Sequence, residues 1–325
     1  MTFDPLPGLP FTGPNLLAPM EGVTEPCFRD LVLALHAPED LGGAYTEFVR
    51  VVDRAYSIEH LRGHLGSERH PMPVGLQIMG ADLAAVRETA RRAVEAGAAL
   101  VDLNFGCPSK GALRGCAGSS LLDRPRDLET LTRTAKEGVG DALPLTAKIR
   151  AGGDDDSRLE ELCRAAENGG AQLITVHCRT RKEAYRDCED WTRLERAVAS
   201  VSVPICGNGG VWKHADLERL RRETGCAMAM VGRAALADPW IFSGVRVDAS
   251  RAARFLADYA ERLTASGRNP TSVAGRLKQL LVTWSAGGLV GEDRASWLRE
   301  KDPQALVERV EQAAAGRLVD PAGAC

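Results

Sequence analysis

Eight short apolar runs recur along the first 244 residues of this 325-residue chain, and helical patterns separate most of them. Short continuous apolar runs are typical of strands buried on both faces of a parallel sheet. The runs are Leu16–Met20, Ala44–Val49, Val74–Met79, Leu100–Phe105, Leu145–Ile149, Leu173–His177, Val203–Cys206 and Met228–Gly232. Residues 82–96, 128–138, 157–168, 191–199 and 215–222 have the apolar spacing of amphipathic helices. This alternation predicts repeated βαβ units.

Eight strands with crossovers predict an α/β chain that closes into a (β/α)8 TIM barrel rather than an open doubly wound sheet. After Phe242 the pattern changes, and residues 251–265, 272–286 and 303–315 read as helices with no strand between them. We therefore expect a barrel domain over residues 1–244 and an all-helical domain over residues 245–325.

The composition and the motifs that it lacks argue against disulfide-rich, zinc-binding, secreted and membrane proteins. The nine cysteines are scattered and include no C-x-x-C pair, which argues against a disulfide framework and a tetrahedral zinc site. His60 and His64 lie four residues apart without the glutamate of a metalloprotease helix, so we expect surface histidines and no metal. Without a signal peptide or a membrane-length apolar stretch, we expect a cytoplasmic protein. The net charge is −3; a mildly basic tail beside an acidic body permits a polyanionic partner and no more.

Polar residues stand at the expected strand ends, where a barrel places its active site. They include Gln77, Asn104, Lys148 and His177. A lysine in an apolar strand needs an anionic partner, and a flavin ring that gains charge on reduction is one. The alternatives are a surface lysine whose amine reaches solvent and a histidine satisfied within the core.

Glycines follow the last two expected strands. Gly207, Gly209 and Gly210 come after the seventh, and Gly232 with Arg233 ends the eighth. Loops at these places in barrels often bind phosphate through backbone N–H groups, and glycine allows close approach. The same glycines could instead form tight turns, with Arg233 capping a helix.

Cys107 is the most specific single signal. It lies in the segment Asn104-Phe105-Gly106-Cys107-Pro108, whose glycine and proline predict a loop beyond the strand. A loop cysteine near Lys110 and Arg114 could act as a nucleophile or a general acid. The alternative is an inert buried thiol.

These segments together resemble the tRNA-dihydrouridine synthases. The matching blocks are Leu17–Val23, Gly75–Gly80, Asp102–Lys110, Ala147–Arg150, Val176–Thr180, Gly207–Gly210 and Met230–Arg233. The resemblance implies FMN as cofactor, with NADPH as reductant and tRNA as substrate. It implies hydride transfer from FMN to C6 of a flipped uracil and a proton from Cys107 to C5. FMN would contact Pro19, Met20, Glu21, Gln77, Lys148, His177, Asn208, Gly209, Gly210, Gly232 and Arg233.

The RNA contacts are less closely tied to the shared blocks. We expect Asn104 to meet the base edge, Tyr185 to contact the base, and Arg179 and Arg181 to meet phosphates from the loop after the sixth strand. Arg276 and Lys278 would bind phosphates from the helical tail. Thr46–Asp53 and Arg276–Gln279 resemble the bacterial branch that modifies position 16. The chain departs from the family at Gly210, where an acidic residue is frequent, and Gly115–Ser120 departs from that branch.

Two other functions remain open from the sequence. Another FMN barrel, such as a dihydroorotate dehydrogenase or an enoate reductase, would share the lysine and the phosphate loop but would not explain the tail. A non-catalytic tRNA-binding barrel would not bind flavin. We expect a monomer.

Overall fold

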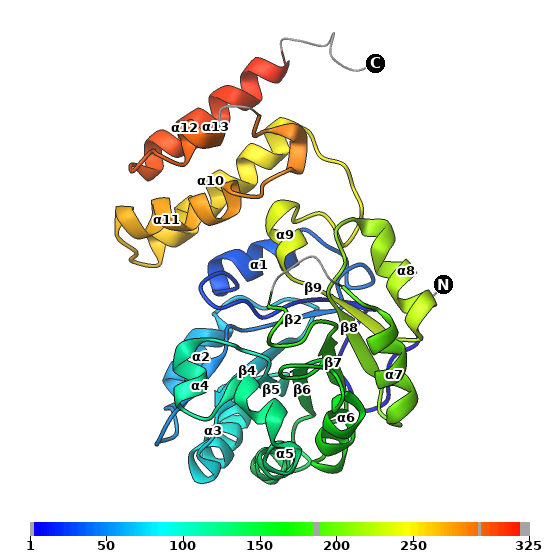
Figure 1. Cartoon of the computed structure of the whole chain (residues 1–325). Coiled ribbons are helices and arrows are strands. Elements are labelled where there is room, and N and C mark those ends of the chain that lie inside the picture. Colours follow the sequence, from blue (N-terminus) through cyan, green and yellow to red (C-terminus); the bar gives the residue numbers. More distant parts are fainter. Residues whose placement is uncertain (1–2, 185–188, 292–293, 319–325) are drawn as a thin grey trace. The chain divides into compact units, whose positions relative to one another are not determined.

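A computed structural model of the chain describes residues 3–184, 189–291 and 294–318. It contains a closed parallel barrel with helices between the strands (Figure 1), as predicted. Contacts divide the chain into two compact units, residues 1–26 with 37–232 and residues 27–36 with 233–325. The second unit therefore begins earlier than the boundary expected at residue 245, and it includes a segment from near the N-terminus.

The strands follow one another around the barrel wall, and every pairing between them is parallel. They are β1 (Asn15–Leu17), β2 (Gly43–Tyr45), β3 (Val49–Val51), β4 (Val74–Gly80), β5 (Leu100–Phe105), β6 (Leu145–Arg150), β7 (Ile174–His177), β8 (Ile205–Asn208) and β9 (Met228–Val231). Pairing of β1 with β9 and of β2 with β4 closes the barrel.

The single strand expected over Ala44–Val49 is wrong in one respect, because the structure divides it into β2 and β3. β2 pairs with the start of β4, and β3 pairs with its second half. The Thr46 hydroxyl accepts a hydrogen bond from the Gln77 backbone at 3.1 Å and donates to the Glu47 carbonyl at 2.7 Å. The Thr46 side chain thus bonds to the β4 backbone at the point where β2 has ended and β3 has not yet begun. The other seven expected strands are present with ends shifted by a few residues.

Helices cover the outside of the barrel. They are α2 (Ile58–Leu65), α3 (Leu83–Ala96), α4 (Lys110–Arg114), η1 (Gly118–Asp123), α5 (Pro125–Val139), α6 (Leu159–Asn168), α7 (Thr192–Ser200) and α8 (His214–Thr224). The Asp82 carboxylate caps α3 by accepting from the Ala85 N–H at 2.8 Å, and Gly97 ends that helix in the left-handed conformation.

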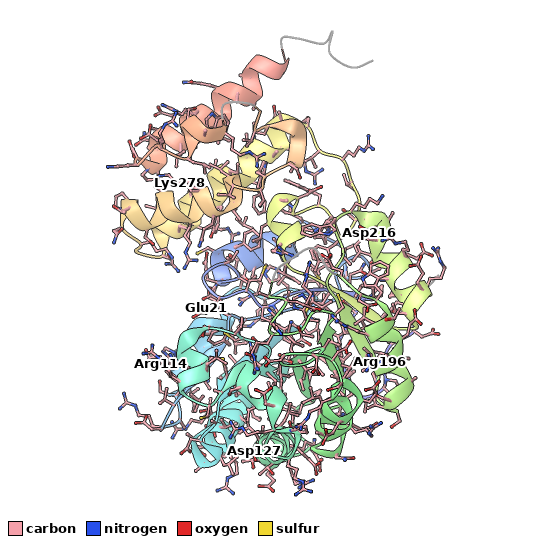
Figure 2. The ribbon with its side chains drawn as sticks, viewed as in Figure 1. Glu21, Arg114, Asp127, Arg196, Asp216 and Lys278 are labelled. Carbon is pink, nitrogen blue, oxygen red and sulfur yellow. The ribbon has the colours of Figure 1, made fainter. Side chains whose placement is uncertain are left out.

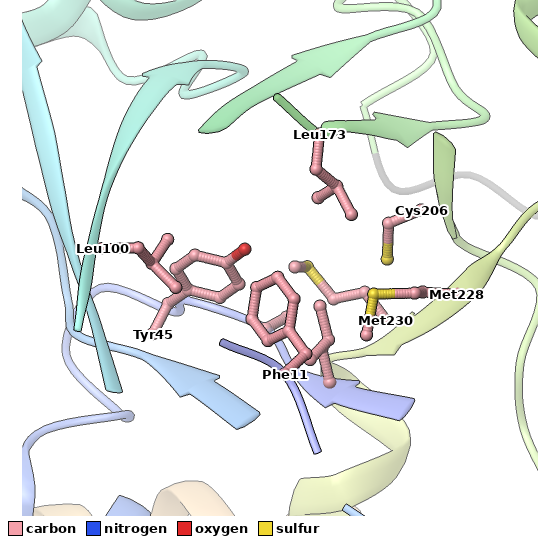
Figure 3. Close-up of a cluster of buried hydrophobic side chains, with 9 residues drawn as sticks. Phe11, Tyr45, Leu100, Leu173, Cys206, Met228 and Met230 are labelled. Atoms are coloured by element: carbon pink, nitrogen blue, oxygen red, sulfur yellow. The ribbon is translucent and has the colours of Figure 1, made fainter. Parts of the chain in front are cut away.

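One end of the barrel interior is filled mainly by aliphatic and sulfur-containing side chains. Phe11 lies beside Tyr45 among residues from six strands or their ends (Figure 3), and all of this cluster is buried. The cluster consists of Phe11, Leu16, Ala18, Tyr45, Leu100, Leu173, Cys206, Met228 and Met230. The barrel is therefore a packed core, and chemistry is confined to its rim.

The second unit is helical and has an aromatic core. Its helices are α1 (Pro26–Ala34, nearly all of it in this unit), α9 (Arg233–Ala237), α10 (Ala249–Ala265), α11 (Pro270–Leu281), α12 (Arg294–Trp297) and α13 (Pro303–Leu318). Phe28 of α1 meets Phe255 and Tyr259 of α10 edge to face. These contacts explain why residues 27–36 group with the tail. No helix in the described segments is both long and apolar enough to cross a bilayer.

Candidate active site at the carboxyl ends of the strands

A chain of side-chain hydrogen bonds runs beneath the Cys107 loop. The buried Asp102 carboxylate accepts from the Thr146 hydroxyl at 2.6 Å and from Gln77 Nε2 at 2.6 Å. Gln77 Oε1 then accepts from Asn104 Nδ2 at 2.8 Å. Because an ionised carboxylate can only accept, Asp102 fixes the orientation of the Gln77 amide, and Gln77 fixes that of Asn104.

The end of this chain orients the Cys107 loop. Asn104 Oδ1 accepts from the backbone N–H groups of Gly106 and Cys107, at 3.0 and 2.9 Å. The Asn104 side-chain oxygen is therefore used inside the protein, and Gln77 is fully buried with both ends of its amide bonded. These contacts make both residues supports of the loop. The resemblance implies that Gln77 contacts FMN, but both ends of its amide are already bonded within the protein.

Cys107 lies on the loop between β5 and α4 and is partly buried. It packs against Met79, Ala112 and Ala117, and its carbonyl accepts from the Ser119 N–H at 3.0 Å. The thiol is thus neither in the deep core nor fully in solvent. A group in this position remains accessible to a ligand at the carboxyl ends of the strands.

Arg150 is a site residue that the sequence patterns do not single out. Its guanidinium donates to the carbonyls of Gly106 at 2.8 Å, Thr180 at 3.2 Å and Ala184 at 3.1 Å. It therefore joins the Cys107 loop to the loop after β7, although the residue itself is only 3% exposed. The signal was present in the sequence as a second basic residue at the end of the Lys148 strand.

Lys148 stands on β6, the strand next to the one that leads into the Cys107 loop. Its register partner on β5 is Asn104, and its amine donates to Asn208 Oδ1 at 3.2 Å. Asn208 Nδ2 donates to the Met230 carbonyl at 2.9 Å, which fixes the amide. Burial first, and the charge of Arg150 second, lower the pKa of Lys148 to about 8. An anionic ligand would oppose this shift.

His177 ends β7 and is held by Arg179. The Arg179 guanidinium lies 3.2 Å from His177 Nε2 and forms an ion pair with Glu189. Because arginine can only donate, His177 Nε2 is an acceptor here. The Arg179 side chain is 1% exposed. Its guanidinium contacts Glu189 and His177, so the prediction that it binds RNA phosphates is wrong.

Backbone N–H groups cluster after β8 and β9. Within the described residues, the N–H groups of Gly209, Gly210 and Gly232 have no hydrogen-bond acceptor. Gly209 and Gly210 have φ values of +105° and +73°, and a Cβ at Gly209 would lie 2.7 Å from the Cys178 sulfur. Glycine is therefore required at Gly209. β8 and β9 are neighbours, so these donors lie at one edge of the barrel.

The remaining expected site residues are dispersed. Pro19, Met20 and Glu21 follow β1, which neighbours β9, and Met20 Sδ would lie 3.3 Å from a Cβ at Gly232. Glu21 is exposed (Figure 2). Arg233 is the exposed first residue of α9. The residues that remain are those predicted to bind RNA, namely Arg181, Arg276, Lys278 and Tyr185.

The predicted RNA-binding residues differ in their surroundings. Arg181 pairs with Asp123 at 2.6 Å and Asp154 at 3.1 Å, so it holds loops together. Arg276 and Lys278 lie on α11 and are partly exposed. Tyr185 lies outside the described residues.

The donor set fits a flavin mononucleotide. In the part of the chain that the structure describes, the glycine N–H groups after β8 and β9 have no acceptor and suit a phosphate, and Lys148 has no carboxylate partner and suits the electron-rich edge of the ring. Lys148, Asn208 and the glycines would hold the group. The Cys107 loop follows β5, the strand next to the one that carries Lys148.

Comparisons with known proteins agree with this arrangement. The family model for dihydrouridine synthase matches residues 16–279. The chain is 36% identical over 231 residues to the tRNA-dihydrouridine(16) synthase of Haemophilus influenzae, covering 69% of this chain and 74% of that protein. It is 30% identical over 314 residues to the tRNA-dihydrouridine(16) synthase of Pseudomonas putida, covering 90% and 95%.

A solved structure is similar in fold alone. Histamine dehydrogenase from Rhizobium sp. 4-9 superposes with a TM-score of 0.60 at 13% identity, over 98% of this chain and 64% of that one. The family match covers the whole barrel and the first tail helices, with the Cys107 loop and the Lys148 strand inside it. The chain therefore belongs to the dihydrouridine synthase family of flavin-dependent enzymes that act on tRNA.

Proposed function

We propose that this chain reduces the uridine at position 16 of tRNA to 5,6-dihydrouridine, with FMN as cofactor, NADPH as reductant and Cys107 as proton donor. The observation that carries the proposal is the adjacency of two strand ends. The Cys107 loop follows β5, and Lys148 stands on β6 in register with Asn104. A flat ligand held by Lys148 would face the loop that carries the thiol.

Bound FMN, once reduced by NADPH, supplies the hydride that C6 of the uracil accepts. Cys107 gives its proton to C5, so the pyrimidine gains one hydride and one proton across its double bond. Lys148 would hold the electron-rich edge of the flavin ring, and the glycine N–H groups after β8 and β9 would bind its phosphate. Asn104 and Arg150 position the Cys107 loop by its backbone.

The assignment to position 16 rests on the relatives that carry this specificity in their names and on two short segments. Thr46–Asp53 begins directly after β2 and contains β3, and Arg276–Gln279 lies on α11. We propose that Arg276 and Lys278 of the helical tail bind tRNA phosphates. The reaction uses one chain and no metal ion, and it takes place in the cytoplasm with tRNA.

The test is to purify the chain, load it with FMN and assay unmodified tRNA transcripts with NADPH. Cys107→Ala should keep its flavin and its reduction by NADPH but lose roughly 10²–10⁴-fold in dihydrouridine formation, the range for a general acid. Cys116→Ala is the matched control, because Cys116 is an exposed cysteine beyond the same loop.

Three results would contradict the proposal. Full activity of Cys107→Ala would remove the thiol from the reaction. An undiminished yield from a transcript with cytidine at position 16 would refute the position. Turnover of dihydroorotate or a small enone, with no reaction on RNA, would favour a small-molecule oxidoreductase.

A further inference from the structure

A cavity of about 510 Å³ opens beside β3 and α2, and none of its lining residues belongs to the candidate flavin site. Its lining includes three arginines and two aromatic rings, together with one acid. These residues are Arg50, Arg54, Arg92, Tyr56, His60 and Asp53. We propose that this pocket binds a nucleotide of the tRNA that neighbours the flipped uridine. Its base would lie against the aromatic pair and its phosphate against Arg50 and Arg54. The inference rests on the proposed function.

The pocket lies at the same end of the barrel as the active site. β3 pairs with the second half of β4, so the residues that follow Val51 emerge at the carboxyl ends of the strands. Arg50 Nη2 also donates to the Gly111 carbonyl at 2.9 Å. Gly111 belongs to α4, which begins three residues after Cys107. The pocket is therefore tied directly to the segment that carries the proton donor.

The charge of the pocket favours an anion. Arg50 and Arg54 are exposed, and neither has a carboxylate partner in the described ranges of the chain. Arg92 is already held by Glu88 at 2.8 Å and by the Tyr56 carbonyl at 2.9 Å. Arg54, together with the remaining donors of Arg50, can bind a phosphate through paired N–H groups. Asp53, the one acid in the lining, leaves an excess of positive charge.

The aromatic pair favours a base. Tyr56 and His60 are stacked, with ring centroids 4.4 Å apart and planes 18° apart. The Tyr56 hydroxyl donates to the Arg50 carbonyl at 3.1 Å, and Ser57 caps α2 by accepting from the His60 N–H at 3.2 Å. The rings are thus fixed before any ligand arrives. Unstacked RNA bases are bound by planar side chains of this kind together with arginine.

A dinucleotide reductant has the same chemistry, a base and a phosphate. The tRNA is the better occupant because the pocket opens to solvent, where a large substrate can reach it. Val52, which lines the pocket, is 61% exposed. The experiment separates the two sources by measuring each half of the reaction.

The first variant is Arg54→Gln, with Arg164→Gln as its matched control. Arg54 makes no hydrogen bond or ion pair within the described residues, so its removal leaves the fold intact. Arg164 is another exposed arginine, on α6. Affinity for an unmodified tRNA transcript is measured in the Cys107→Ala background at several salt concentrations. Arg54→Gln should weaken tRNA binding about 3- to 10-fold. It should also reduce the slope of the logarithm of affinity against the logarithm of salt concentration by about one, the effect of one lost phosphate contact.

The second variant is Tyr56→Ala, with Tyr56→Phe as its control because phenylalanine keeps the ring. Tyr56→Ala should weaken RNA binding by roughly ten-fold, the effect of one lost base stack, and Tyr56→Phe should change it little. Neither variant should slow the reduction of bound FMN by NADPH. Thermal melting identifies any variant that fails to fold, and Arg54→Gln then decides the question.

Two outcomes overturn the pocket alone. If the wild-type chain reduces uridine but Arg54→Gln and Tyr56→Ala bind RNA as Arg164→Gln does, no nucleotide of the tRNA occupies the pocket. If the variants instead slow FMN reduction, the occupant is the dinucleotide. A wild-type chain that neither binds nor reduces tRNA would overturn the proposed function, and the pocket assignment with it.

Discussion

Asp102→Asn is expected to stabilise the folded chain at neutral pH and to leave it almost unchanged in acid. The substitution keeps the size of the side chain, so no cavity forms. The amide oxygen of the introduced asparagine could still accept from Gln77, and the Thr146 hydroxyl could accept instead of donating. What the substitution removes is a buried negative charge, since Asp102 is 1% exposed.

The magnitude follows from the pKa of Asp102, which burial raises from 3.8 to about 6 against the opposing hydrogen bonds of Thr146 and Gln77. Between these two values the folded chain binds more protons than the unfolded chain, so this residue makes stability fall as pH rises from about 4 to 6. The full effect is about 3 kcal/mol in the free energy of unfolding above pH 6.

Urea unfolding of the wild-type chain and of Asp102→Asn at pH 4 and pH 7.5 measures this difference, because titrating groups remote from Asp102 cancel between the two proteins. The variant should gain about 3 kcal/mol relative to wild type between the two pH values. A difference in unfolding free energy that is the same at both pH values would refute the reasoning. Because Asp102 also opposes the fall in the pKa of Lys148, the stabilised variant should lose charge on that lysine at lower pH.

Three further outcomes are expected at the rim. Burial lowers the pKa of Lys148 to about 8, so FMN affinity in equilibrium titrations should fall as pH rises above 8, and a flat profile would count against the contact. Arg150→Met should slow dihydrouridine formation more than FMN reduction, because the lost hydrogen bonds join the Cys107 loop to the loop after β7; equal slowing of both would mean a general folding defect. Gly209→Ala should weaken FMN binding and cost about 1–3 kcal/mol in urea unfolding, from backbone strain and the 2.7 Å approach to the Cys178 sulfur; wild-type behaviour would refute this.

The sequence determined the barrel because the evidence for each strand is local. A run such as Met228–Gly232, which has no charged or polar side chain, predicts burial on both faces whatever its neighbours are. The glycine and proline around Cys107 likewise predict a loop without further information. The order of strands and helices then leaves few topologies, and the carboxyl ends of the strands follow as the place for chemistry.

Pairing between distant residues was decided by the tertiary structure. The sequence marks Gln77, Asn104 and Arg179 as polar residues near strand ends, but burial and partners determine what they do. Gln77 and Asn104 support the Cys107 loop, and Arg179 is neutralised by Glu189, which is ten residues away in the chain. Side-chain direction and hydrogen-bond partners depend on which strands become neighbours, and periodicity carries no information about them.

Pairing between distant residues also explains the division of the second expected strand and the position of the domain boundary. A side-chain hydroxyl at Thr46 substitutes for strand pairing only because β4 lies beside it. Residues 27–36 join the helical unit because Phe28 finds Phe255 and Tyr259 there. Apolar patterning says that these residues are buried, and only the folded chain determines which partners bury them.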